Sequence, residues 1–211
     1  RVAANRLCVI YKTRMLITTY TSNWVKYFMD IKREIENGLH GFVYTIEHIG
    51  STSVPNLDPK AIIDIDIIYS NQSGFEKIKL GLQEIGYYHN GNQGIEQRDV
   101  FKRNSKWTNE ILDSVKHHLY VCPIGSMALE RHILSRDFLR KNDWARRKYQ
   151  RMKYELAEKA NQDRKVYAVL KEFNVNAFID SIIEEEKRTH NNASVKNGQD
   201  SLTSPLVHYQ L

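Results

Sequence analysis

The chain has 211 residues, of which 41% are hydrophobic and 27% are charged, a composition that is ordinary for a globular domain. No run of about 18 apolar residues is present, which argues against a transmembrane helix, and the first residues lack the continuous apolar core of a signal peptide. The two cysteines, Cys8 and Cys122, are too few for a disulfide framework. We therefore expect a cytoplasmic protein with reduced thiols and no membrane partner.

The net charge of +6 is concentrated in one segment. Residues 131–153 contain nine lysines and arginines but only two aspartates. A basic surface suits an anionic ligand such as a nucleotide, or a polyanion such as RNA. The sequence does not interleave aromatic and basic residues as RNA-binding surfaces do, which disfavours RNA. For most of these residues, an ordinary solvated helix surface is the alternative that we favour.

The first half of the chain predicts alternating helices and strands. Trp24, Phe28, Ile31 and Ile35 recur at helical spacing and predict an amphipathic helix over 23–37. Short apolar segments predict strands over 42–48 and 61–69, and a second helical pattern covers 73–85. Further strands are expected from Tyr87 and over 97–103 and 115–121, separated by polar loops at 89–97 and 104–113.

After Pro123 the pattern becomes helical, with helices predicted over 126–139, 144–160 and 164–183. The buried side of the last helix is expected to carry Val166, Val169, Leu170, Phe173, Ala177 and Phe178. We divide the chain into an α/β core at 15–122 and a C-terminal helical part at 123–186. Residues 1–14 are expected to be an extension outside the fold, and residues 187–211, which are polar, are expected to be a disordered tail.

The stretch 46–69 carries the most informative residues. The small-residue turn Gly50-Ser51-Thr52-Ser53 precedes the strand that bears Asp64 and Asp66. Because side chains two apart in a strand share a face, the two carboxylates should lie together and repel. A divalent cation bound to both carboxylates would remove this repulsion, and phosphate oxygens would complete its coordination shell. Gly50 allows the backbone to approach the phosphates closely, and Ser51 offers them a hydroxyl. The alternative is a buried strand with two aspartates at its solvent-facing end, next to serine and threonine residues that only cap the N-terminus of a helix.

Gly50-Ser51 followed by Asp64-x-Asp66 resembles the nucleotidyltransferase superfamily of the DNA polymerase beta type. The longer string His48-Ile-Gly-Ser-Thr-Ser-Val-Pro55, with Lys60 and Ile63-Asp64, is similar to the GrpB family within it. The resemblance runs from about 15 to 183. It implies an α/β (α+β) fold: a mixed, twisted sheet of about four or five strands with flanking helices, and a C-terminal three-helix part that closes over the site.

The resemblance also implies metal-dependent transfer of a nucleoside monophosphate from an NTP to an acceptor, which could be a protein hydroxyl, a small metabolite or RNA. Asp64 and Asp66 would be the catalytic ligands of Mg²⁺ or Mn²⁺. The residues expected to bind phosphate or nucleotide are Gly50, Ser51, Ser53, Lys60, Arg98, His118, Arg136 and Arg140.

Three points of the resemblance leave alternatives open. The superfamily usually has a third carboxylate on a neighbouring strand, but residues 116–122 contain no Asp or Glu, so the alternative function is a non-catalytic nucleotide-binding or regulatory module. Arg136 and Arg140, four apart, could clamp a triphosphate or an anionic acceptor, or Asp137 could hold Arg140 or Lys141 in a structural pair. His118 could replace the missing ligand or contact phosphate, although a lone histidine on a strand is more often a hydrogen-bonded structural residue.

Overall fold

A computed structural model describes residues 15–196, with side chains described as far as Thr189. The expected extension at 1–14 and the end of the expected tail, 197–211, lie outside the described residues. The fold is α/β, as predicted, with a five-stranded mixed sheet in the order β1-β2-β5-β4-β3. The strands are β1 (Thr45–Ile49), β2 (Ile63–Tyr69), β3 (Tyr87–His89), β4 (Asp99–Arg103) and β5 (His117–Pro123). The α-helices are α1 (Asn23–Glu36), α2 (Gln72–Glu84), α3 (Glu110–Ser114), α4 (Met127–Lys141), α5 (Asp143–Lys159) and α6 (Arg164–Lys196).

The sheet is built around β2, which pairs antiparallel with β1 and parallel with β5. Strand β4 then pairs antiparallel with both β5 and β3. The register sets Asp64 beside Ile49 on β1 and beside His118 on β5. This placement brings the residue after β1, Gly50, and the first half of β5 next to the acidic end of β2.

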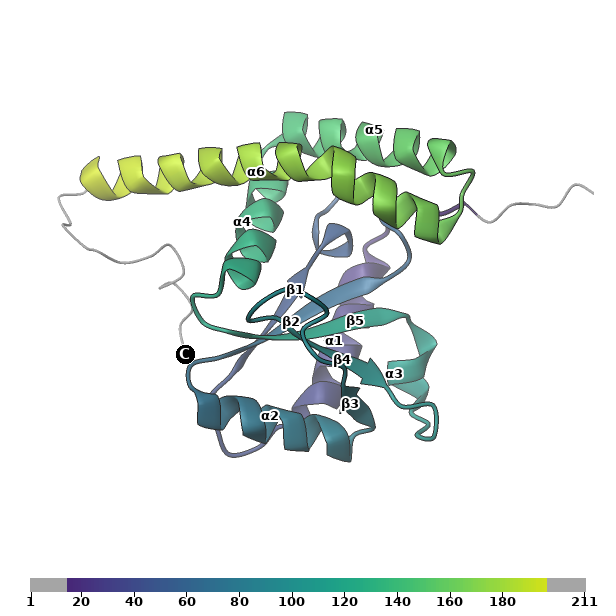
Figure 1. The fold of residues 1–211 in the computed structure, drawn as a ribbon, viewed down its shortest axis with the longest axis vertical. Coiled ribbons are helices and arrows are strands. Elements are labelled where there is room, and N and C mark those ends of the chain that lie inside the picture. The colour runs from purple at the N-terminus through teal and green to yellow at the C-terminus, as the bar shows by residue number, and fades with distance from the viewer. Residues whose placement is uncertain (1–14, 197–211) are drawn as a thin grey trace, which may run out of the picture.

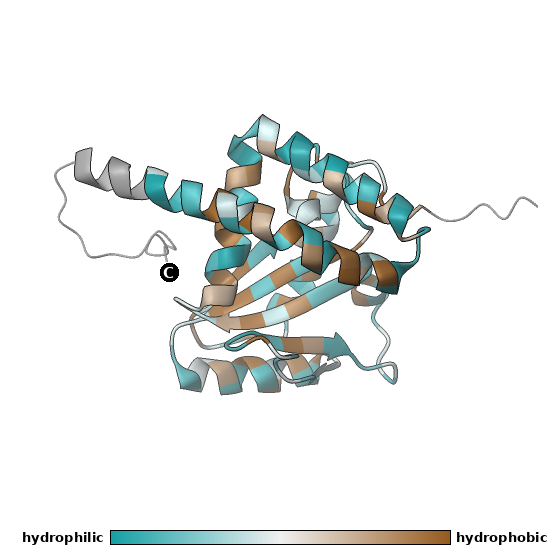
Figure 2. Ribbon diagram, turned by 45° about the horizontal axis from the view of Figure 1, so that its top comes forward, coloured by the Kyte–Doolittle hydropathy of each residue, from teal (hydrophilic) through white to brown (hydrophobic). Residues whose placement is uncertain are grey.

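The two faces of the sheet bury different helices. Ile63, Ile65 and Ile67 are fully buried on one face and pack against α1 and α2, in a core that also contains Phe28 and Phe75. On the other face, Ile68 and Cys122 pack against Leu129 and Ile133 of α4. The hydropathy colouring of Figure 2 shows apolar segments of the strands interrupted by polar ones. Asp64 and Asp66 point to the α4 face because they alternate with the buried isoleucines.

The C-terminal helices cover one end of the sheet. In Figure 1, α5 and α6 lie side by side at the end opposite α2, and α4 connects them to the sheet. A separate hydrophobic cluster holds them together, with Tyr149 and Leu156 of α5 packing near Tyr167 and Phe178 of α6. Val54 and Leu57, from the segment between β1 and β2, join this cluster. The helices therefore dock onto the segment that carries the Gly50-Ser51 turn.

Helix α6 differs from its prediction in two ways. Its exposed side carries Val166, Val169 and Phe173, the last of them 81% exposed, so the expected burial of these three is wrong. Phe178 is buried as predicted, together with Tyr167, Val175 and Ile182. Apolar residues on both sides of the helix made the pattern ambiguous.

The helix also continues to Lys196, so the part of the expected tail at 187–196 is helical. Ion pairs join Lys187 to Glu130 and Glu186 to Lys141, both on α4. Lys187 and Arg188 are good helix formers that follow the glutamates at 184–186, and together with these ion pairs they favour continuing the helix beyond its predicted end. Helix α3, which lies partly within the polar loop expected at 104–113, was not predicted. It is short and is capped by the Asn109 side chain.

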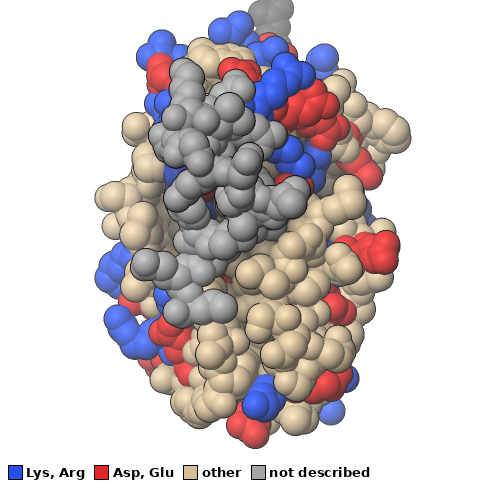
Figure 3. All heavy atoms as spheres, turned by 90° about the vertical axis from the view of Figure 1, so that its left-hand side faces the viewer, with Lys and Arg blue, Asp and Glu red and all other residues tan. Residues whose placement is uncertain are grey.

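The basic segment does not form a uniformly positive surface. Arg146 and Arg147 both pair with Asp143, and the face in Figure 3 shows acidic side chains among the basic ones at the end formed by α5 and α6. Within residues 15–196, no helix is long and apolar enough to cross a membrane.

Candidate functional site

A cavity of about 340 Å³ lies where the sheet meets the C-terminal helices. Its sheet side is formed by the turn after β1 and by β2 and β5, and its helical side by α4, α5 and α6. Six of the ten residues predicted for the site line it: Gly50, Ser51, Lys60, Asp64, His118 and Arg136. The structure therefore brings most of the predicted site residues together around one cavity.

The turn at Gly50 fixes how closely the serine and the acid approach. Gly50 has φ 69° and ψ −171°, and a Cβ added there would lie 2.3 Å from Asp64 Oδ2. Only glycine therefore lets the turn pack directly on the carboxylate. Ser51–Ser53 then form a 3-10 turn, in which the Ser53 hydroxyl donates to the Gly50 carbonyl at 2.6 Å. Ser53 stabilises the turn and does not line the cavity.

The two aspartates have different environments although they share a face. His118 Nδ1 donates to Asp64 Oδ1 at 2.8 Å. Burial alone would raise the pKa of Asp64, but the hydrogen bond and the positive charge of His118, together with that of Lys171, lower this pKa overall. Asp66 is fully buried, accepts a hydrogen bond from His132 Nδ1 at 2.8 Å and does not line the cavity.

The acids fit a divalent cation only in part. Asp66 Oδ1 is buried with no hydrogen-bond partner among the described residues, so this oxygen still has its lone pairs for a cation. Across residues 15–189, no group of three or more His, Cys, Asp or Glu side chains could hold a metal ion. Mg²⁺ commonly takes one or two carboxylates and completes its shell with water and phosphate oxygens. Asp64 and Asp66 fit that kind of shared site, and they do not form a complete protein cage.

Lysines supply most of the positive charge of the cavity. Lys153 is 2% exposed, and its Nζ lies 3.1 Å from Ser51 Oγ and hydrogen-bonds the Asp58 carbonyl. Burial, helped by the nearby charge of Lys171, lowers the pKa of Lys153 to about 7. Lys60 Nζ lies 4.9 Å from the centre of the Tyr167 ring, and burial lowers the pKa of Lys60 to about 8. An anionic ligand would offset this crowding of positive charge.

The predicted arginines are engaged in structural contacts. Arg136 touches the cavity, but its guanidinium is bound by Glu47 at 2.6 Å, by Asp137 at 2.7 Å and by the His48 carbonyl at 3.1 Å. Arg140 Nε donates to the Ser53 carbonyl at 3.0 Å and does not line the cavity. Both therefore brace the 47–53 segment against α4. Arg140 Nη1 lies 3.6 Å from Asp137 Oδ1. The two residues therefore form the structural ion pair that was the alternative to phosphate binding.

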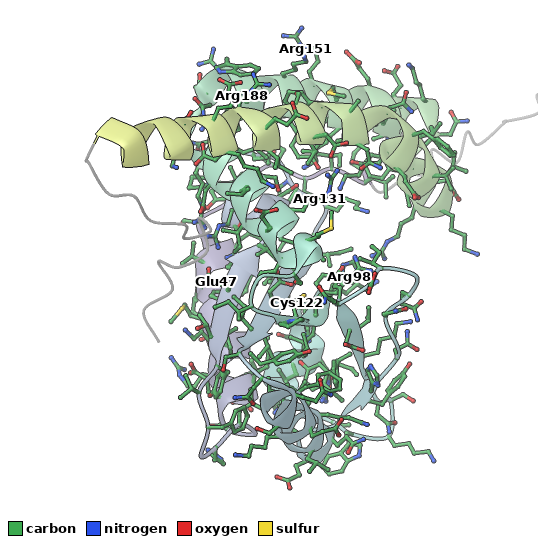
Figure 4. The ribbon with its side chains drawn as sticks, turned by 60° about the vertical axis from the view of Figure 1, so that its left-hand side comes forward. Glu47, Arg98, Cys122, Arg131, Arg151 and Arg188 are labelled. Atoms are coloured by element: carbon green, nitrogen blue, oxygen red, sulfur yellow. The ribbon has the colours of Figure 1, made fainter. Side chains whose placement is uncertain are left out.

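Arg98 also lies outside the cavity lining, stacked over the Tyr120 ring at 4.7 Å. Tyr120 itself is a lining residue, so Arg98 adjoins the site without facing into it. Figure 4 shows Arg131 on α4 beneath α6, and Arg151 on the outer side of α5, pointing away from the sheet. Arg131 lines the cavity while it pairs with Asp180 and donates to Asn176 of α6 at 3.2 Å.

Several lining residues were not predicted from the sequence. His132 and Arg131 come from α4, and Tyr167 and Lys171 come from α6. Tyr167 and Lys171 are four residues apart and so share a helix side. That spacing, next to the apolar residues at 175, 178 and 182, is the signal that could have identified them.

Comparison with known proteins gives consistent results. The family model described as GrpB protein matches residues 14–185. The glutamate-rich protein GrpB of Alkalihalophilus pseudofirmus is 29% identical over 177 residues, covering 83% of this chain and 98% of that protein. The UPF0157 protein YqkA of Bacillus subtilis is 30% identical over 146 residues, which are 69% of this chain but only 40% of YqkA. The crystal structure of the conserved protein GrpB from Enterococcus faecalis superposes with a TM-score of 0.66 at 26% identity, covering 82% of this chain and 98% of that one.

Proposed function

Because the chain belongs to the GrpB protein family, we propose that its cavity binds a nucleoside triphosphate and transfers the nucleoside monophosphate to an acceptor. The observation that carries the proposal is the convergence of the Gly50-Ser51 turn and Asp64 on one cavity lined by three lysines. A polyphosphate matches that set, because ammonium groups and a serine turn bind its oxygens.

The residues have distinct roles in this proposal. The Gly50-Ser51 turn and Lys60 hold the phosphates, and Lys171 adds charge from the opposite wall. Asp64 and Asp66 would hold Mg²⁺ or Mn²⁺, which when bound offsets the charge of the polyphosphate. His118 keeps the Asp64 carboxylate oriented through its hydrogen bond. Arg136 acts indirectly, by holding Glu47 and the His48 carbonyl in place.

A second candidate is a non-catalytic nucleotide-binding module. The observation that favours it is the burial of Asp66, which is bonded to His132 and absent from the cavity wall. With Asp64 as the one carboxylate among the described residues of the lining, such a site would bind a magnesium nucleotide without turning it over.

Labelled nucleotides separate the two candidates. Each of the four NTPs is incubated with the protein and Mg²⁺ or Mn²⁺, and binding and pyrophosphate release are measured in parallel. Asp64→Asn, which keeps the side-chain volume, is compared with Asp30→Asn on α1, whose carboxylate pairs with Lys26 instead. Turnover that is lost only in Asp64→Asn supports the transferase. Metal-dependent binding without pyrophosphate release supports the module, and the absence of both in the wild-type protein would contradict the proposal.

A further inference from the structure

The contact between Lys153 and Ser51 has the geometry of a base beside a nucleophile. Lys153 Nζ is 3.1 Å from Ser51 Oγ, within hydrogen-bond distance, and Ser51 lines the cavity. The same amine also bonds the Asp58 carbonyl. A carbonyl can only accept, so Nζ donates one N–H to it. A neutral amine then still has its lone pair to accept the proton of the Ser51 hydroxyl.

The surroundings of Lys153 favour the neutral amine. Its side chain is almost fully enclosed, and Lys60 and Lys171 face it from the β1–β2 segment and from α6. Asp58 and Asp64 are the acids near it, and they do not offset the cost of burial, so the pKa of Lys153 falls to about 7. A lysine in this state serves as a general base near neutral pH.

We propose that Ser51 is a covalent nucleophile, activated by Lys153, that accepts the nucleoside monophosphate before it passes to the final acceptor. This inference rests on the nucleotide binding proposed above. It also supplies a base that does not depend on a third carboxylate at the acids, because Glu47, the residue opposite Asp66 on β1, is held by Arg136.

The step balances as a double displacement. Ser51 Oγ forms a bond to the α-phosphorus, the bond from that phosphorus to the bridging oxygen of the β-phosphate breaks, and pyrophosphate leaves. The Oγ proton moves to Lys153 Nζ. The acceptor hydroxyl then attacks the same phosphorus, its own proton passes to water, and Lys153 returns a proton to the departing Ser51 oxygen.

The test is covalent labelling of the full chain without an acceptor. The protein is incubated with each α-³²P-labelled NTP and Mg²⁺ or Mn²⁺, quenched in acid and examined by mass spectrometry. We expect one nucleoside monophosphate on the peptide that contains Ser51, and none in Ser51→Ala. Lys153→Met removes the amine but keeps its length, and should slow labelling at least 100-fold. Lys159→Met, an exposed lysine on the same helix, should label like the wild-type protein.

The pH profile adds a readout that a structural role would not change. Labelling of the wild-type protein should rise about tenfold per pH unit on the acid side, until the Lys153 amine is deprotonated. Pyrophosphate release with no adduct on Ser51, or equal labelling of Lys153→Met, would overturn this inference and leave the proposed transferase standing. Failure of every NTP to bind would overturn both.

Discussion

Gly50 offers a direct test of how the site is assembled. Its backbone conformation, φ 69° and ψ −171°, is accessible almost only to glycine, and a Cβ there would lie 2.3 Å from Asp64 Oδ2. Gly50→Ala therefore imposes backbone strain of about 1–3 kcal/mol. It also drives the Asp64 carboxylate from its hydrogen bond with His118, at a cost of about 1–3 kcal/mol. We expect the free energy of unfolding to fall by about 2–6 kcal/mol in total.

Gly125→Ala is the matched control. Gly125 has φ 81°, but a Cβ there would meet nothing within 4 Å, so only the backbone cost of about 1–2 kcal/mol should appear. Urea denaturation followed by tryptophan fluorescence measures both variants, and metal-dependent nucleotide binding should be lost in Gly50→Ala alone. Equal losses of stability in the two variants would refute the contact between the turn and Asp64.

Other predictions concern the supports of the site and the surface of α6. Arg136→Met leaves Glu47 without its partner in a largely enclosed position, and thermal denaturation should show a loss of about 3–5 kcal/mol. Burial lowers the pKa of His48 to about 4, so His48 binds a proton more readily in the unfolded chain than in the folded protein. Stability should therefore fall as the pH drops from about 6.5 to about 4, and urea titrations of His48→Gln should lack this part of the fall. Phe173→Ser should change stability by less than about 0.5 kcal/mol, whereas Phe178→Ser should cost about 3 kcal/mol or more in the same assay.

The sheet side of the site was predictable because its signals are local. A glycine before a serine turn, and aspartates alternating with isoleucines, fix a close approach and a shared face within a few residues of each other. The structure accordingly places Ser51 and Asp64 in one cavity. The different environment of Asp66 was not predictable, because it depends on His132, which is 66 residues away on α4.

The helical side could not be derived in the same way. Apolar residues occur on both sides of α6, so periodicity alone did not show which side docks, and Phe173 was placed inside although it is 81% exposed. Arg136 was predicted to bind phosphate because the sequence shows its charge but not its partners. Its partners, Glu47 and the His48 carbonyl, are nearly 90 residues away and became apparent only in three dimensions.

The position of α6 has a consequence for ligand choice within the family. Five of its residues, Tyr167, Lys171, Val175, Asn176 and Ile179, line the cavity opposite the serine turn. Lys153 of α5 already reaches Ser51 across 102 positions of sequence. Apart from Lys171, which belongs to the proposed phosphate site, the residues that α6 contributes shape the remaining space of the cavity, and they can diverge while the turn and the acids stay the same. Two relatives with the same turn and the same acids can accept different molecules if their last helices differ.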